Sequence, residues 1–168
     1  MKRSERLSVE RLLRHCRMFL YASAGSPDCL VNPVAENFFQ FGLLHLTSTM
    51  FITTDKKTDP AAGVFHRILD PMGHGTLLAG VDAALATKVG QTTLRQFIRT
   101  KRNKLATHRD LSFLSQSKEA RNVAYNKIAL KQYEAAMHLL ETAVLALSRE
   151  LERMTEAKNR ARAIGPSA

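Results

Sequence analysis

Apolar residues recur every three or four positions along most of this chain, which is the spacing of one face of an α-helix. The pattern predicts helices over residues 4–22, 33–53, 60–69 and 76–88, another that restarts near residue 92 and reaches the basic segment 99–110, and a long one over 118–160. No stretch alternates apolar and polar residues as a half-buried strand does. We therefore predict an all-α fold, an irregular bundle of about four to six helices with a long C-terminal helix, as a single domain of residues 1–168.

Proline, glycine and capping residues mark the predicted helix boundaries. Asn32 and Asp59 each precede a proline, which is the arrangement of an N-cap followed by proline in the first turn. Residues 70–75, DPMGHG, form the clearest break, and Gly90 interrupts the alanine-rich helix that follows it. The helix after Asn32 carries several phenylalanines, which predicts that it belongs to the core.

The long C-terminal helix carries a heptad-like seam of apolar residues. The seam comprises Leu130, Tyr133, Met137, Leu140, Val144, Leu147, Leu151 and Met154. Alternating steps of three and four residues place these side chains on one face. Packing against the rest of the bundle explains such a seam. Contact with a second chain explains it equally, and would make the protein an oligomerising structural protein.

The charge balance narrows the choice of partners. The chain contains 25 Lys and Arg against 15 Asp and Glu, which is a formal net charge of +10. Such an excess favours polyanions such as nucleic acid, because binding releases their condensed counterions. A basic protein that has no such partner is the alternative.

Cysteine content and hydropathy bear on the compartment. Cys16 and Cys29 are too few to stabilise a domain of this size through disulfides, so a reduced intracellular setting is expected. No run approaches the roughly 18 consecutive apolar residues of a membrane span. No signal peptide is apparent, because charged residues interrupt the apolar positions near the N-terminus. We expect a soluble, cytoplasmic protein that has no membrane partner.

Several catalytic classes find no support in the sequence. It contains no Gly-x-Ser-x-Gly elbow, no P-loop and no Gly-rich dinucleotide loop. His66, Asp70 and His74 lie close together, but no third histidine or cysteine nearby completes a metal site. A ferritin-like dimetal centre needs Glu-x-x-His pairs, which do not occur. We therefore expect neither a metal nor a cofactor.

The segment RTKRNKLATHRD, residues 99–110, concentrates the candidate chemistry. On an ideal helix, one face carries Arg95, Arg99, Arg102 and Arg109, and another carries Lys101, Lys104 and His108. The apolar residues that remain to attach this helix to the core are Leu94, Phe97, Ile98 and Leu105. Arginines on one stripe repel one another, which indicates an anionic ligand. A solvated basic face is the alternative.

Arginine and histidine together suit one reaction on RNA. Arginine keeps its charge and can hold two phosphate oxygens at once. Histidine has an unperturbed pKa near neutrality, so it can take and return a proton. A histidine that helps the 2′-hydroxyl to attack and an arginine that stabilises the charged transition state suffice in principle for metal-free RNA cleavage.

Arg102, Asn103 and His108 lie in the run RNKLATHRD, which resembles the signature of the HEPN superfamily of helical proteins. That signature has an arginine, often followed by a polar residue such as asparagine, and a histidine five or six positions further on. The wider run, with Lys104 and Asp110, is similar to the abortive-infection branch. The proline-led third helix and the long final helix are also similar in placement.

The resemblance implies an RNA endonuclease of toxin or phage-defence type that acts as a homodimer, with an antitoxin protein as a further partner. It implies that Arg102 binds and polarises the scissile phosphate, that His108 acts as general acid or base, and that Asn103 orients the site. Lys104 and Asp110 would support that site. The superfamily also includes inactive members, so a helical RNA-binding or protein-interaction module remains the alternative. Three arginines would contact the nucleic-acid backbone beside the site: Arg95, Arg99 and Arg109.

An unbroken helix would separate the two catalytic side chains. Each helical residue turns by about 100°, so Arg102 and His108 would point about 120° apart. Either the helix ends near Ala106, or the partner chain supplies the second group. The sequence is compatible with both arrangements.

Overall fold

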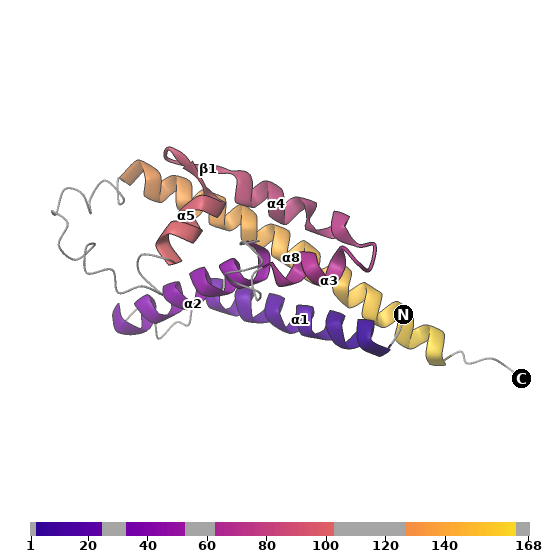
Figure 1. Cartoon of the computed structure of the whole chain (residues 1–168). Coiled ribbons are helices and arrows are strands. Elements are labelled where there is room, and N and C mark those ends of the chain that lie inside the picture. The colour runs from indigo at the N-terminus through magenta and orange to yellow at the C-terminus, as the bar shows by residue number, and fades with distance from the viewer. Residues whose placement is uncertain (1–2, 25–32, 53–62, 103–126, 164–168) are drawn as a thin grey trace, which may run out of the picture.

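The computed structural model describes residues 3–24, 33–52, 63–102 and 127–163 (Figure 1). The elements in chain order are α1 (Arg3–Ala24), α2 (Pro33–Phe51), α3 (Val64–Leu69), the 3-10 helix η2 (Gly75–Leu78), α4 (Ala79–Ala86), β1 (Lys88–Val89), β2 (Thr92–Thr93), α5 (Leu94–Lys101) and α8 (Lys127–Ala163). These helices confirm the predicted all-α bundle with a long final helix. Within the described ranges, no helix combines the length and apolar character needed to cross a membrane.

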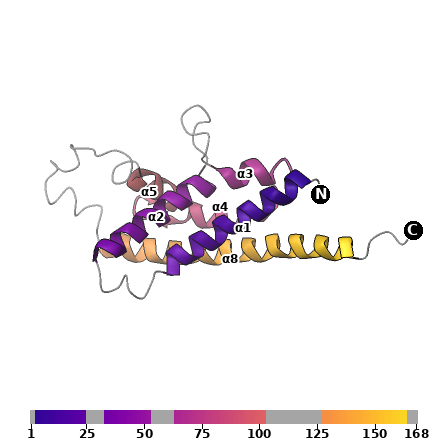
Figure 2. The ribbon, with the colours of Figure 1, turned by 90° about the horizontal axis from the view of Figure 1, so that it is seen from below.

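Helix α8 is the element along which the bundle assembles. Helix α1 runs antiparallel beside it, and α4 packs on it as well (Figures 1 and 2). The central seam residues are buried: Met137, Leu140, Val144, Leu147 and Leu151. Leu130, at the N-terminal end of the seam, is 47% exposed. The chain's own helices therefore cover the central seam, which supports packing within the bundle rather than contact with a second chain.

Aromatic contacts join the first three helices. Phe51, at the end of α2, meets Phe19 of α1 edge to face, with ring centroids 6.3 Å apart. It also meets Phe65 of α3 at 4.9 Å, and all three rings are fully buried. Phe41 of the same helix is 41% exposed. The prediction that α2 is a core helix therefore holds for its last turns and is wrong at Phe41.

The predicted break after α3 is a helix-ending turn. The His74 N–H donates to the Leu69 carbonyl at 2.8 Å, and the Gly73 N–H donates to the Asp70 carbonyl at 3.0 Å. Gly73 has a φ of 78°. This is the Schellman arrangement, in which glycine adopts the left-handed conformation at low steric cost. Residues 70–75 thus turn the chain from α3 into η2 and α4.

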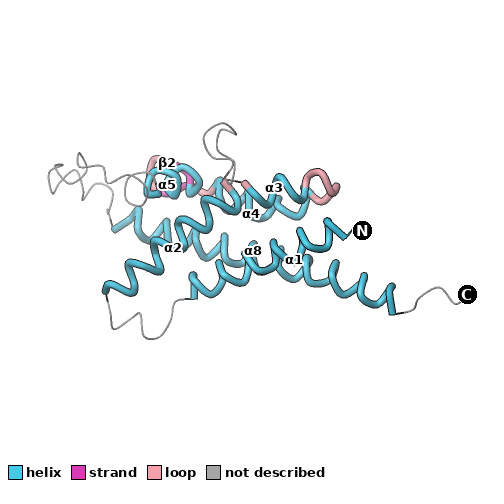
Figure 3. Tube along the Cα trace, turned by 60° about the horizontal axis from the view of Figure 1, so that its bottom comes forward, coloured by secondary structure: helices cyan, strands magenta, loops and turns pink. Residues whose placement is uncertain are grey.

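A small hairpin, which the sequence did not predict, leads into α5. β1 and β2 pair antiparallel, with Lys88 opposite Thr93 and Val89 opposite Thr92. Gly90, with a φ of 61°, takes the first position of the two-residue turn, as in a type II′ turn. Two-residue strands are too short to show an alternating pattern, so only Gly90 marked this reversal in the sequence. Figure 3 shows the hairpin and α5 together at one edge of the bundle.

Several predicted features lie outside the described residues. They are the Asp59–Pro60 helix start, Cys29, the segment 103–110 and the start of the long helix before residue 127. Within the described part, α3 begins at Val64, after Gly63 with a φ of 65°.

Candidate functional site

Helix α5 and its C-cap carry the described part of the predicted site, and three features hold this helix in place. The Thr93 side chain accepts a hydrogen bond from the Gln96 backbone N–H at 3.3 Å, which caps the helix. Leu94 and Ile98 are fully buried, as predicted. Phe97 packs against Tyr133 of α8, with ring centroids 5.1 Å apart. These contacts fix the direction in which the basic side chains of α5 project.

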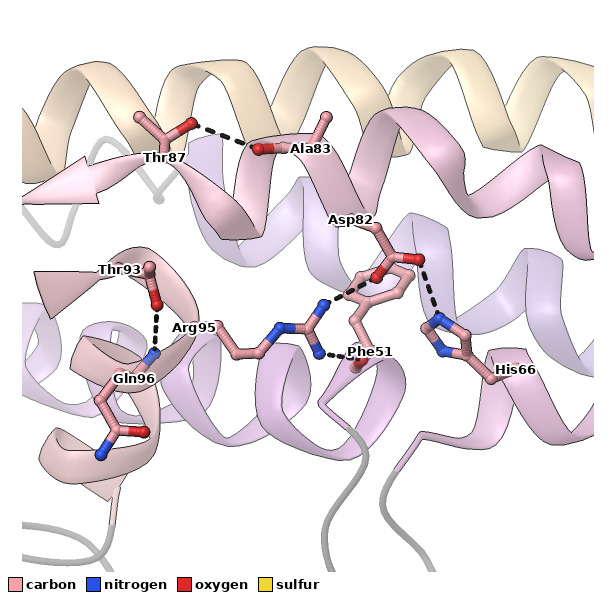
Figure 4. A network of polar contacts seen from close by, with 8 residues as sticks. All are labelled: Phe51, His66, Asp82, Ala83, Thr87, Thr93, Arg95 and Gln96. Atoms are coloured by element: carbon pink, nitrogen blue, oxygen red, sulfur yellow. Dashed lines mark hydrogen bonds and ion pairs between the residues drawn. The ribbon is translucent and has the colours of Figure 1, made fainter.

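Arg95 is engaged inside the protein. Its Nη2 donates to Asp82 Oδ1 at 2.7 Å, and its Nη1 donates to the Phe51 carbonyl at 3.4 Å (Figure 4). The Phe51 carbonyl belongs to the last turn of α2, where carbonyls lack intrahelical donors. Arg95 therefore ties the start of α5 to both α4 and α2. Arg95 is the first arginine of the predicted basic stripe, and Asp82 offsets its charge.

The Asp82 carboxylate also contacts a histidine of α3. Its Oδ2 lies 3.1 Å from Nε2 of His66 on α3 (Figure 4). An imidazole that donates from Nε2 leaves Nδ1 as an acceptor. His66 Nδ1 is buried and has no hydrogen-bond partner among the described residues.

The sequence analysis did not single out Asp82, although one signal was present. Asp82 is the only charged residue in the helix AGVDAALA, whose Val81 and Leu85 are buried. A lone carboxylate beside a buried face needs a partner, because an unpaired charge is costly to desolvate. The identity of that partner depends on the tertiary fold, which brings Arg95 and His66 to one carboxylate.

Arg102, the predicted phosphate-binding residue, ends the described part of this region. It is the C-cap residue of α5, and its Nη1 donates to Ser48 Oγ at 2.7 Å. Ser48 is fully buried in α2, and the Arg102 side chain is partly buried. The guanidinium is thus oriented at the junction of α2 and α5, which limits the rotamers available to it.

The two other cations of α5 differ in their surroundings. Arg99 is exposed and makes no ion pair with any residue in the described ranges. Lys101 Nζ lies 5.4 Å from the centre of the Phe97 ring, a cation–π distance. Arg99 is therefore the arginine of α5 that is open to an external anion.

The rest of the predicted site lies outside the described residues. It consists of Asn103, Lys104, His108, Arg109 and Asp110. The relation between Arg102 and His108, within one chain or across two, therefore stays a prediction.

Two side chains packed in the core have raised pKa values. Burial, with a smaller contribution from the Glu152 carboxylate, raises the pKa of the Cys16 thiol to about 12. Burial likewise raises the pKa of the Tyr133 phenol to about 12, with a contribution from Glu141. A thiol that remains protonated is a poor nucleophile. Cys16 is fully buried in the core face of α1.

The histidine cluster weighed as a metal site does not gather ligands. Within the described ranges, no three His, Cys, Asp or Glu side chains come close enough to hold an ion. His66 turns to Asp82 rather than to Asp70 or His74.

Taken together, the described geometry presents one preoriented guanidinium, Arg102, and one exposed guanidinium, Arg99, at the end of a well-anchored helix. Such a pair can bind a phosphate or another oxyanion without a metal. The chain matches no known family model, no curated protein and no solved structure.

Proposed function

We propose that this protein is a metal-independent RNA endonuclease of toxin or phage-defence type, with an Arg/His site at a homodimer interface. The observation that carries the proposal is the run RNKLATHRD in a basic all-α chain, with its arginine already oriented by the fold. The net charge of +10 supports a polyanionic substrate. An antitoxin protein is proposed as a further partner.

In the proposed mechanism, Arg102 holds two oxygens of the scissile phosphate and offsets the charge that develops in the transition state. His108 takes a proton from the attacking 2′-hydroxyl or gives one to the leaving 5′-oxygen. Asn103 orients these groups, and Lys104 and Asp110 support them.

Two arginines, Arg99 and Arg109, contact the phosphate backbone on either side of the cleaved bond. The described contacts favour a different role for Arg95. Its guanidinium holds α5 against α4 through Asp82. We therefore propose that Arg95 positions helix α5 and that Arg99, rather than Arg95, contacts the RNA backbone.

RNA cleavage in EDTA by the wild-type protein and by His108→Ala tests the proposal. We expect a cyclic-phosphate and a 5′-hydroxyl end from the wild type, no cleavage of the 2′-deoxy substrate, and a loss of roughly 10²-fold or more in His108→Ala. Equal cleavage by both proteins, or none on any RNA tried, would remove His108 from the catalytic role.

An inactive RNA-binding module is the second candidate, favoured by the net charge and by the exposed Arg99. Binding would then weaken steeply with salt and would survive His108→Ala unchanged. Loss of RNA binding on that single substitution would argue against this candidate.

A further inference from the structure

The outward face of α1 is a second surface with a distinct composition. Buried side chains attach the opposite face of this helix to the core: Val9, Leu12, Leu13, Cys16 and Phe19. Because these buried residues hold the helix from Val9 to Phe19, its other side has a constant orientation to solvent over that span. Six side chains share that outward side by helical spacing: Arg3, Leu7, Arg11, Arg14, Met18 and Tyr21.

Three of these outward residues are large and apolar or aromatic. Leu7 is 53% exposed, Met18 48% and Tyr21 65%. They lie among the most exposed large hydrophobic residues of the described chain. Isolated surface hydrophobes are ordinary, so these three side chains carry an argument only together with the charges that share their helix face.

The arginines of α1 fall into two groups. At the flank of the helix, Arg6 pairs with Glu10 at 3.0 Å, and Arg17 pairs with Glu152 of α8 at 3.2 Å. The three outward arginines, Arg3, Arg11 and Arg14, are exposed and make no ion pair with any residue of the described ranges. The chain thus neutralises the flank and leaves the outward face cationic.

The pKa of a neighbouring histidine is consistent with this arrangement of positive charges on α1. His15, which follows Arg14 on the same helix, has a lowered pKa, first because of burial and then because of the positive charges of Arg11 and Arg14. A face with unpaired guanidinium groups attracts carboxylates or phosphates.

The combination of arginines and apolar side chains on the outward face of α1 distinguishes among its possible anionic partners. A nucleic-acid backbone would satisfy the arginines, but it would leave Leu7 and Met18 without an apolar partner. A second copy of this chain, docked face to face, would set arginine against arginine. An amphipathic helix with acidic flanks meets both requirements, since it offers an apolar stripe and carboxylates together. Arginine, methionine and tyrosine are also the residue types enriched in protein interfaces, from which lysine is depleted.

We propose that the outward face of α1 docks an acidic amphipathic helix of a partner protein. Leu7, Met18 and Tyr21 contact its apolar stripe, and Arg3, Arg11 and Arg14 pair with its carboxylates. Leu7 and Tyr21 are 14 residues apart, which spans about 21 Å at about 1.5 Å per residue. A partner helix of roughly four turns matches that length. The proposal does not rest on the nuclease activity.

The test uses the full chain and two labelled synthetic peptides of identical composition. In one peptide, leucines recur at helical spacing with glutamates flanking them; in the other, the same residues are dispersed around the helix. Fluorescence anisotropy measures the affinity of each peptide for the wild type and for two α1 variants, Met18→Ala/Tyr21→Ala and Arg11→Gln/Arg14→Gln. Arg149→Gln/Arg153→Gln, on an exposed side of α8, is the matched control.

We expect the amphipathic peptide to bind the wild type and the α8 control alike, and each α1 pair to weaken binding roughly tenfold or more. Tyr21 is exposed, and its ring also contacts that of Phe39 of α2, with centroids 6.2 Å apart. Unchanged circular dichroism and melting would therefore be required to show that the α1 variants still fold. Failure of the amphipathic peptide to bind, equal affinity for both peptides, or an equal loss in the α8 control would overturn the proposal. So would binding of an RNA oligonucleotide or of anionic vesicles that depends on Arg11 and Arg14 but not on Met18 and Tyr21.

Discussion

Helices α5 and α1 both carry several arginines, and they differ in how many of these side chains bind groups of the protein itself. Arg99 of α5 is exposed, as are the outward arginines of α1. On α5, Arg95 is received by Asp82 and the Phe51 carbonyl, and Arg102 by Ser48. On α1, the outward arginines meet solvent. The difference teaches that positive charge alone does not assign a role. An arginine that donates hydrogen bonds to acceptors of its own chain is held in one orientation, whereas an exposed arginine is available to bind an anionic partner.

The largest effect on stability is expected from a substitution on the buried side of α5, compared with one on the exposed face of α1. Ile98→Ala removes a fully buried side chain that holds α5 to the core. It should lower the free energy of unfolding by about 2–5 kcal/mol, because it creates a cavity. Leu7→Ala on α1 is the control and should stay within about 0.5 kcal/mol. Urea denaturation measures both, and equal effects would show that α5 is not anchored as described.

The second-largest effect on stability is expected at Asp82 of α4, whose carboxylate contacts side chains of α3 and α5. Asp82→Asn keeps the shape of the side chain and removes the charge that faces Arg95 and His66. We expect a loss of about 1 kcal/mol in unfolding free energy, a modest value because the pair is partly exposed to solvent. Glu156→Gln, an exposed carboxylate of α8, should cost less than half of that. A thermal melt that does not distinguish the two variants would assign Asp82 no role in holding α5.

A smaller effect is expected where Arg102 meets α2. Ser48→Ala removes the hydroxyl that accepts from the Arg102 guanidinium. The cost in unfolding free energy should be about 0.5–1 kcal/mol, since a partly buried arginine can recruit water in place of the hydroxyl. Under the proposed function, RNA cleavage should fall more than stability does, because Arg102 loses one of the contacts that orient it. Ser148→Ala, at a buried serine of α8, is the matched control.

The smallest effect concerns pH and α1. The pKa of His15 is lowered in the folded protein by burial and by Arg11 and Arg14. The unfolded chain therefore binds this proton more readily, so the contribution of His15 to stability is present above about pH 6.5 and is lost as the pH falls below it. Urea unfolding at pH 7.5 and 5.5 should show a smaller decrease for His15→Gln than for the wild type. An identical decrease in both would contradict the shift.

Much of the fold follows from local pattern. The helices α1, α2 and α8 are long enough for their three- and four-residue periodicity to appear in the sequence, and the seam from Met137 to Leu151 is buried as its spacing predicted. The hairpin escaped prediction because each strand has only two residues. Periodicity needs several repeats before it can be recognised.

The site was predictable only in part, for a related reason. Helical spacing identified Leu94 and Ile98 as the buried side of α5. It could not pair Arg95 with Asp82, because that contact depends on the hairpin turning α5 back beside α4. The contact between Arg102 and Ser48 joins residues 54 positions apart and depends on the packing of α2 and α5.

The central claim is that the oriented guanidinium of Arg102 acts on the scissile phosphate. The most direct test is the single-turnover rate of RNA cleavage in EDTA by Arg102→Ala, with Arg153→Ala on the exposed side of α8 as the charge-matched control. We predict that the first substitution lowers the rate by roughly 10²–10³-fold in a protein that still folds, as expected when a donor to the transition state is removed. The control should leave the rate unchanged. Equal rates for Arg102→Ala and the wild type would contradict the account.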